Sequence, residues 1–527
     1  MYFFGGYFME SPFFKKKYQV VIIGGALSGM ACALQLLSKG IKDILILEQH
    51  NLPGGIATSF VRSGTEIEAT LHEMMSIGNE NQLKIGEFFK ECGIDIDWIR
   101  VPDAYRYVDK DVNCLVHAGT HGDFETPAKE MASCVGDEDG SVYQKILSFL
   151  NMCKKVYDAM NYVSMHEISK PMMLLKFPEL VKTCGYSAKE VMDSYGLPKK
   201  VQDILSAYWI YVGNVVDDLP FSIFAFLLAD YLGYGSVVPR KFSHEMSLKM
   251  AEKCVSQGVQ MEYGQRVSQI LVKDKKAYGV ITADGSEILA DYVVCSAYPN
   301  TAYTKMISPK SEVPKEAIRL TNFRKLGLTC FSVVLLLDKD PEELNIHDYS
   351  TFYAPEGMDF GRIWKDYATE GPYKYITSIC TNIANPGCTK KGTCIYSITA
   401  LPRPDGWMKV TEENYEEMKR LNAKFFIEME SKRLGVNLYD HILDIVIESP
   451  VSIAHYTGSF RGSVYGYQHR MNDSIVARLG MDDKEHYIGH LSFAGAHQIS
   501  GDGMGPAITN GRKAAKEILS SLEKEGR

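Results

Sequence analysis

The sequence lacks the features that mark nucleic-acid-binding and membrane-spanning proteins. Its 527 residues carry 57 Lys and Arg against 65 Asp and Glu, a formal net charge of −8, whereas a nucleic-acid-binding protein usually shows a basic excess. No stretch reaches the roughly 20 consecutive apolar residues of a membrane-spanning helix. Repeats and low-complexity tracts are absent, and a hydrophobic content of 46% is ordinary for a folded chain. We therefore expect a folded protein without a nucleic-acid partner.

The cysteine pattern argues against a metal centre. The 12 cysteines are scattered, with no C-x-x-C pair and no Cys/His cluster at zinc spacing. We therefore expect no metal, and reduced thiols in a cytoplasmic protein. A single cysteine such as Cys32 or Cys295 is expected to be a small buried core residue.

Residues 1–17 form an aromatic and basic tail. Seven aromatic residues precede or adjoin Lys15, Lys16 and Lys17, whereas a signal peptide places its basic residues before its apolar run. We therefore do not expect export. Aromatic residues beside lysines are also typical of a membrane interface. Packing of the tail on its own protein is the preferred interpretation, and peripheral membrane contact is the alternative.

Residues 18–48 predict a strand–helix–strand unit that binds a dinucleotide. YQVVII at 18–23 is typical of a buried strand, a helical pattern runs from the next turn to Gly40, and ILILE at 44–48 predicts the second strand. The helix start between them offers unpaired amides and partial positive charge to phosphate. The glycines of such a turn permit close approach of the pyrophosphate and of the helix. The phosphate-contacting residues are expected to be Gly24, Gly25, Ala26, Leu27, Ser28 and Gly29.

The carboxylate of Glu48 completes the dinucleotide pattern. Gly24 and Gly29 take the first and third glycine positions of G-x-G-x-x-G, and Ala26 takes the second. Glu48 stands at the tip of the second strand, where a carboxylate accepts hydrogen bonds from the ribose of an adenosine. The alternative is a nucleotide-free unit with a solvated Glu48.

Two further glycine-rich segments favour FAD over NAD. Gly54 and Gly55 form a second turn that can run along the dinucleotide. Residues 488–523 then predict a strand, a glycine-rich loop and a helix, whose N-terminus suits the flavin end of the molecule. No second glycine-rich unit for NAD(P) occurs, so electrons would come from a quinone, oxygen, a small donor or a protein partner. The loop residues expected to contact FAD are Gly495, Gly503, Met504 and Gly505.

These residues carry a family resemblance. VVIIGGALSG…LILEQHNLPGGIATSF and LSFAGAHQISGDGMGPAITNGRKAA resemble the FAD-dependent phytoene desaturase, carotenoid isomerase and retinol saturase superfamily, which shares its fold with flavin amine oxidases. Segment 64–78 is similar to that group's F-D-x-G-x-H, and segment 257–297 to the part that brings backbone at Val267 against the adenine. The positions matched in F-D-x-G-x-H are Ile67, Glu68, Thr70 and His72.

The expected fold is α/β, with a discontinuous Rossmann-type FAD-binding domain and a mixed α+β substrate domain. We assign residues 18–78, 240–300 and 486–527 to the FAD-binding domain. The substrate-binding domain takes residues 79–239 and 301–485.

Few acid–base side chains are needed for chemistry at a flavin, because the cofactor itself carries the hydride. The candidates are His72, in the block expected to approach the flavin, and His497, in the C-terminal loop; a structural histidine is the alternative for each. Arg240 and Lys241 are a candidate pair for a substrate carboxylate, with a solvated pair preferred. The aromatic stretch at 220–234 is interpreted as a core helix rather than the lining of an apolar tunnel.

Three functions compete at this point. The first is a flavoenzyme that desaturates, saturates or isomerises an elongated apolar molecule: a polyene, a retinoid or an unsaturated fatty acid. The second is an amine or amino-acid oxidase. The third is a non-enzymatic escort of prenylated proteins of the GDP-dissociation-inhibitor type, which the intact glycine pattern and Glu48 disfavour. A homodimer is left open.

Overall fold

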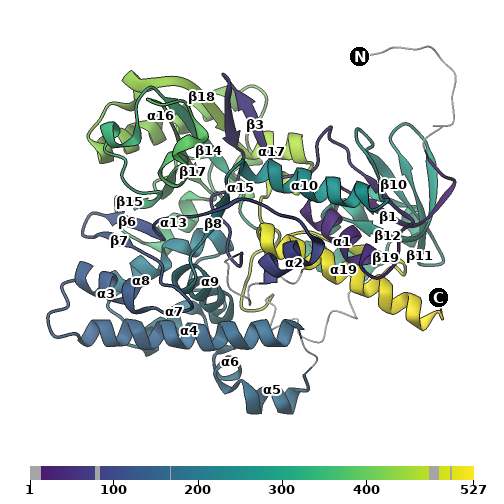
Figure 1. The fold of residues 1–527 in the computed structure, drawn as a ribbon, viewed down its shortest axis with the longest axis horizontal. Coiled ribbons are helices and arrows are strands. Elements are labelled where there is room, and N and C mark those ends of the chain that lie inside the picture. Colours follow the sequence, from purple (N-terminus) through teal and green to yellow (C-terminus); the bar gives the residue numbers. More distant parts are fainter. Residues whose placement is uncertain (1–13, 78–83, 166–167, 474–485, 499–500, 527) are drawn as a thin grey trace.

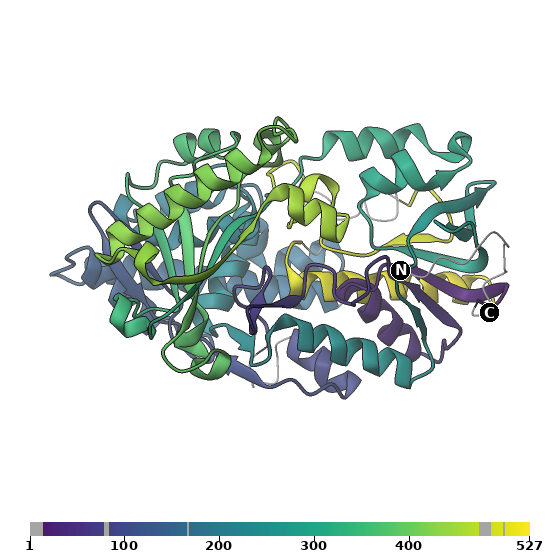
Figure 2. The ribbon, with the colours of Figure 1, turned by 90° about the horizontal axis from the view of Figure 1, so that it is seen from above.

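The computed structural model describes residues 14–77, 84–165, 168–473, 486–498 and 501–526. Two large sheets lie toward opposite ends of an elongated molecule, with helices between and around them (Figures 1 and 2). Most of the predicted N-terminal tail lies outside the described residues. At its described end, Lys15 forms an ion pair with Asp43 at 2.9 Å.

The first sheet contains the predicted strand–helix–strand unit. β1 pairs in parallel with β2 and with β12, and the helix α1 (Leu27–Leu37) connects β1 to β2. β1 thus has a parallel neighbour on each side, and in such sheets ligands bind beyond the carboxyl ends of the strands at this point. The strand order is β13 (Ile307–Ser308), β10 (Val267–Lys273), β11 (Lys276–Thr282), β12 (Glu287–Cys295), β1 (Lys17–Ile23), β2 (Ile44–Leu47) and β9 (Gln260–Glu262), with β19 (Leu491–Phe493) also paired to β12.

Both faces of this sheet are covered, as its apolar strands require. Val20 and Ile22 of β1 pack with the core that includes α1, whereas Val21 and Ile23 pack on the other side. β10 and β11 pair antiparallel and form a hairpin around KDKK at 273–276. Its tip residues, Asp274 and Lys275, have φ of 51° and 57°, as a two-residue type I′ turn requires.

The second sheet forms the core of the rest of the chain. Its strand β14 is buried at every residue, and β6 joins β15 in parallel although some 240 positions separate them along the chain. The order is β18 (Ile442–Glu448), β14 (Phe331–Leu337), β17 (Cys394–Ala400), β16 (Ile376–Cys380), β15 (Ser350–Ala354), β6 (Tyr105–Asp109) and β7 (Asn113–Val116). Shorter pairs are β3 (Ser59–Arg62) with β4 (Thr65–Glu68), and β5 (Trp98–Arg100) with β8 (Val237–Pro239).

Helices cover both sheets (Figure 1). The last helix runs beside α1, and the contact is close: a Cβ at Gly511 would lie 2.1 Å from the Ser28 carbonyl oxygen. Among the described residues, no helix combines the length and the apolarity needed to cross a membrane. Besides α1 the helices are α2 (Lys84–Cys92), α3 (Glu125–Cys134), α4 (Ser141–Met165), α5 (Lys170–Lys176), α6 (Pro178–Thr183), α7 (Ala188–Ser194), α8 (Lys199–Leu205), the 3₁₀ helix η1 (Ser206–Val212), α9 (Phe221–Gly233), α10 (Phe242–Ser256), α11 (Pro299–Thr301), α12 (Lys315–Phe323), α13 (Phe360–Asp366), α14 (Thr381–Ala384), α15 (Pro404–Trp407), α16 (Tyr415–Leu434), α17 (Pro450–Thr457) and α19 (Met504–Lys524).

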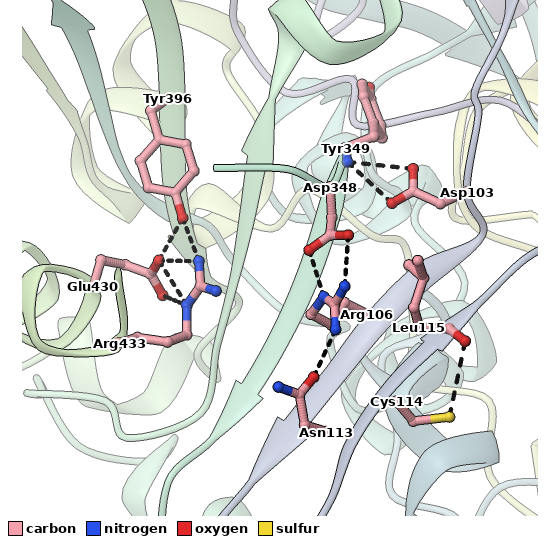
Figure 3. A network of polar contacts seen from close by, with 10 residues as sticks. All are labelled: Asp103, Arg106, Asn113, Cys114, Leu115, Asp348, Tyr349, Tyr396, Glu430 and Arg433. Atoms are coloured by element: carbon pink, nitrogen blue, oxygen red, sulfur yellow. Dashed lines mark hydrogen bonds and ion pairs between the residues drawn. The ribbon is translucent and has the colours of Figure 1, made fainter. Parts of the chain in front are cut away.

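A buried ionic cluster joins α16 to the second sheet (Figure 3). The side chain of Glu430 is fully buried, and Arg433 lies 2.6 Å from it. Tyr396 of β17 donates its hydroxyl to Glu430 and accepts a hydrogen bond from Arg433. The cluster fixes α16 on the sheet.

The segments assigned to the FAD-binding domain supply most of the first sheet, and β13 extends that sheet to Ser308, beyond the expected limit at residue 300. The domain limits themselves stay a prediction. Pro220 immediately precedes α9, so the aromatic stretch at 220–234 is helical, as expected.

Candidate functional site

A single cavity of about 2640 Å³ begins at the predicted dinucleotide loops and continues among apolar side chains of the second half of the molecule. The first residues of two helices, α1 and α19, line it. Both predicted histidines line it, as do twelve of the fourteen residues predicted to contact the cofactor. These twelve are Gly24, Ala26, Leu27, Ser28, Glu48, Gly54, Gly55, Val267, Gly495, Gly503, Met504 and Gly505.

The two remaining residues, Gly25 and Gly29, support the loop from behind. A Cβ at Gly29 would lie 2.1 Å from the Gly24 carbonyl oxygen, so only glycine permits this contact between helix and loop. Gly24 itself has a φ of 99°, which disfavours side chains with a Cβ. The loop geometry therefore depends on the first and third glycines of the motif.

Glu48 is positioned by the backbone around it. Its carboxylate accepts hydrogen bonds from the amides of Gly25 at 2.6 Å and His50 at 2.8 Å. Burial raises the pKa of Glu48, and these amide hydrogen bonds oppose the rise. The carboxylate lies at the cavity wall beside the loop, where a ribose hydroxyl of a dinucleotide could donate to it.

The second glycine turn is joined directly to the first. The Gly54 amide donates to the Gly25 carbonyl at 2.9 Å. Gly54 has a φ of 111°, and a Cβ there would lie 2.3 Å from the Ala57 carbonyl oxygen. Gly54 and Gly55 thus lie along one wall of the cavity, and their contact with the cofactor stays a prediction.

The C-terminal loop closes the far end of the cradle. Gly495 and Gly503 have φ of 128° and 93°, and α19 begins at Met504. The amides at this helix start offer partial positive charge to an electron-rich group.

The residues present fit a flavin dinucleotide. Two helix N-termini and two glycine turns line one elongated cavity. Buried polar atoms at its wall have no hydrogen-bond partner among the described residues. The Ser296 hydroxyl and the His497 Nε2 atom are both buried and form no hydrogen bond within the described chain. Orphaned polar groups at a cavity wall indicate a polar ligand.

Both candidate histidines are neutral in this setting. Burial lowers the pKa of His72 to about 4. Burial lowers the pKa of His497 to about 3, with Arg324 adding to the effect. A neutral imidazole can accept a proton or donate one hydrogen bond, so the catalytic roles of His72 and His497 stay predictions.

Of the other candidates, the aromatic stretch at 220–234 reaches the cavity, whereas Arg240 lies at the surface. Ile223, Phe226, Leu227 and Tyr231 of α9 line the cavity, while other residues of that helix pack in the core. The aromatic helix therefore serves both as core and as cavity wall. Arg240 lies away from the cavity lining and pairs with Asp97 at 2.6 Å on the surface.

The sequence analysis missed a buried carboxyl group beside His72. Glu73 lines the cavity and accepts a hydrogen bond from Ser236, which lies 163 positions further along the chain. The sequence could have pointed to Glu73, because it directly follows His72 of the segment similar to F-D-x-G-x-H. Ser296 was also missed, although it directly follows β12, which ends at Cys295.

Comparison with protein families gives one match. The model of the flavin-containing amine oxidoreductase family matches residues 27–379. Among curated proteins, the prolycopene isomerase of Daucus carota is 23% identical over 96% of this chain and 81% of that protein. The hydroxyneurosporene desaturase of Cereibacter sphaeroides is 21% identical over 97% and 99%. The all-trans-retinol 13,14-reductase of Rattus norvegicus is 21% identical over 88% and 80%.

Solved structures show the same fold. An oxidoreductase from Methanosarcina mazei superposes with a TM-score of 0.62 at 14% identity, covering 96% of this chain and all of that chain. Cyclohexylamine oxidase from Brevibacterium oxydans gives a TM-score of 0.60 at 14% identity, covering 96% and 99%. At these identities the likeness concerns the fold alone.

Proposed function

The chain belongs to the flavin-containing amine oxidoreductase family, and from this premise we propose that it acts on carbon–carbon double bonds of an elongated polyene or retinoid. The chain is an FAD-dependent enzyme of the oxidoreductase and isomerase type that the sequence resemblance implies. The relatives named above are an isomerase, a desaturase and a reductase, each of an apolar polyene by its name. The substrate and the direction of the reaction are our proposal.

The observation that carries the proposal is the continuity of the cavity. The same space that is lined by the dinucleotide loops is lined further on by apolar side chains of α4, α5 and α9, among them Met160, Met173 and Phe226. A long apolar molecule that enters between these helices would extend toward the loop at Gly495. Pockets lined by apolar side chains with a few polar groups favour such ligands.

The residues of this chain would bind and orient both partners. The helix starts at Leu27 and Met504 and the carboxylate of Glu48 would hold the dinucleotide. The apolar arm would hold the substrate and exclude water from the reacting carbons. Bound FAD would supply hydride chemistry.

Anaerobic incubation of the purified, FAD-loaded protein, assayed once with oxidised flavin and once with chemically reduced flavin, with a panel of polyenes, retinoids and unsaturated fatty acids tests this function. We expect a polyene or retinoid to be converted, and mass spectrometry after chromatography to identify the reaction. A gain of two hydrogens indicates saturation, a loss of two desaturation, and an unchanged mass at a new retention time isomerisation. The flavin-stripped protein is the control.

Amine oxidation is the second candidate, since the family and several structural neighbours include amine oxidases. Turnover of amines with release of peroxide, and no conversion of any polyene, would overturn the proposal in favour of this candidate. The escort function has no support beyond the shared architecture, because the chain belongs to an enzyme family.

We also propose that the substrate arrives from a membrane surface that α5 contacts. Exposed fractions are 50% for Met172, 58% for Leu174 and 77% for Leu175, and α5 projects beneath α4 at the edge of the molecule (Figure 1). The neighbouring Met173 lines the cavity. Lys176 and Lys182 are exposed on the same α5–α6 hairpin of an otherwise acidic chain. Apolar side chains flanked by lysines suit an anionic lipid surface.

Replacing both exposed leucines by glutamate, L174E/L175E, should abolish binding to anionic vesicles. Each buried leucine contributes about 1.5–3 kcal/mol, so we expect at least a tenfold loss in a flotation assay with phosphatidylglycerol–phosphatidylcholine vesicles. The matched control, F323E/L443E, changes two similarly exposed residues, 58% and 57%, that lie away from the cavity. Equal flotation of both double variants would show that α5 is not the contact.

A further inference from the structure

Glu73 is a buried acid at the cavity wall without a cationic partner among the described residues. Its exposed fraction is 7%. One carboxyl oxygen, Oε2, accepts a hydrogen bond from the Ser236 hydroxyl. The other, Oε1, is buried and forms no hydrogen bond. A buried polar atom left without a partner is costly, so its retention beside a ligand cavity calls for a functional explanation.

The surroundings of Glu73 are aromatic. Tyr211 and Tyr231 line the same cavity, with ring centroids 5.8 Å apart, and the Tyr211 ring lies 6.0 Å from that of His72. The Tyr211 hydroxyl is itself buried without a hydrogen-bond partner. The Glu73 carboxyl group and the Tyr211 hydroxyl therefore lie among aromatic rings at the wall of the cavity, where an apolar substrate would pass.

This environment keeps the carboxyl group protonated. Burial raises the pKa of Glu73 to about 8, and the negative charge of Asp103 adds to the rise. The hydrogen bond from the Ser236 hydroxyl opposes it. At neutral pH Glu73 is therefore mainly a neutral acid with a proton to give.

The segment that carries Glu73 is fixed on both sides. The His72 carbonyl accepts a hydrogen bond from the Tyr349 hydroxyl. Met74 exchanges two backbone hydrogen bonds with Val237, at 2.8 and 2.9 Å. The Ser76 amide donates to Asp230 at 3.2 Å. The carboxyl group of Glu73 is thus held in place at the wall, as a catalytic acid requires.

We propose that Glu73 is the catalytic acid that donates a proton to a carbon of the substrate double bond, an inference that rests on the proposed function. In saturation, Glu73 gives its proton to one carbon of the π bond that breaks. Bound FAD, reduced beforehand by an external two-electron donor, would supply the hydride that the neighbouring carbon gains. The substrate would thereby be reduced and the flavin oxidised, and the Glu73 carboxylate regains a proton from water. In isomerisation, the proton adds to one carbon, rotation follows about the bond that has become single, and the same proton returns to the carboxylate.

Replacing Glu73 by glutamine tests the proposal. The carboxamide keeps the shape and can still accept from Ser236, but it cannot serve as the acid. We expect E73Q to retain FAD and to form product about 10²–10⁴-fold more slowly, the range typical of general acids. In the wild-type enzyme the rate should fall as the pH rises through about 8, because the acid then loses its proton. This alkaline limb should be absent from E73Q.

Ser236→Ala is a second test of the same acid. The Ser236 hydroxyl stabilises the ionised carboxylate of Glu73, so its removal should shift the alkaline limb to higher pH. Infrared spectra without substrate give a separate measurement: a protonated-carboxyl carbonyl band present at pH 7, lost above pH 8 and missing from E73Q.

Two results would overturn the inference and are distinguishable. Conversion of a polyene by E73Q at the wild-type rate and with the wild-type pH profile would remove Glu73 from the reaction while leaving the proposed function intact. Failure of the wild-type enzyme itself to convert any polyene or retinoid would overturn the proposed function and this inference with it.

Discussion

Replacing Gly29 by valine should abolish retention of FAD. Even the first carbon of the new side chain would lie 2.1 Å from the Gly24 carbonyl oxygen and 3.2 Å from Ile22 Cγ2. The first contact is with backbone, which cannot rotate away, so α1 must separate from the loop that would hold the pyrophosphate. Loss of that alignment removes the helix-terminal amides from the phosphates.

The measurement is the ratio of flavin absorbance to protein in purified samples. We expect the FAD content to drop at least about tenfold, equivalent to ~1.4 kcal/mol or more of binding free energy. Circular dichroism should show retained secondary structure, since the second sheet has its own apolar core. The matched control is Gly387→Val, because a Cβ at Gly387 has no neighbour within 4 Å. Wild-type FAD content in G29V would overturn the assignment of the cofactor site.

The part of the fold that was predictable from the sequence is local along the chain. The strand at 17–23, the helix at 27–37 and the strand at 44–47 follow one another within about thirty residues, the usual length of such a unit. Their apolar runs and glycine turn carry the signal. The hairpin at Asp274 and Lys275 is likewise formed by residues that are close together in the sequence.

The second sheet was not predictable in this way. The apolar run of β14 is local, but its partners are β17 and β18, and β6 joins β15 from more than two hundred positions away. Such pairings depend on which apolar faces remain uncovered after the helices have packed. No local residue pattern encodes that choice.

The candidate site likewise contains residues that could be predicted from the local sequence and residues that could not. The residues predicted to contact the cofactor are recognisable in the sequence because glycine turns and helix starts impose a fixed spacing on them. Glu73 is different, since its chemistry arises from Ser236, Tyr211 and Asp103, which reach it from distant segments. From the sequence alone a glutamate is expected to be solvent-exposed, and only the folded chain shows that Glu73 is buried.

Replacing Arg433 by methionine should strongly destabilise the second sheet. Glu430 has no exposed side-chain surface, and Arg433 contacts both of its oxygens, at 3.1 Å from Nε to Oε1 and 2.6 Å from Nη2 to Oε2. Without the guanidinium, the buried carboxylate of Glu430 loses its counter-charge, and the Tyr396 hydroxyl loses one of its two partners (Figure 3). Breaking a buried pair in this way costs about 3–5 kcal/mol, a large part of the stability of a typical domain.

Urea unfolding followed by tryptophan fluorescence measures this loss, because Trp209, Trp364 and Trp407 all pack in the core of the second sheet. The double variant E430Q/R433M should recover most of the midpoint, since an amide keeps a partner for Tyr396 and carries no charge. Arg106→Met is the matched control: Arg106 pairs with Asp348, but its side chain is 25% exposed and that of Asp348 11%, so water replaces part of what is lost. If R433M and R106M shifted the midpoint equally, burial of the ionic cluster would not be what stabilises α16 on the sheet.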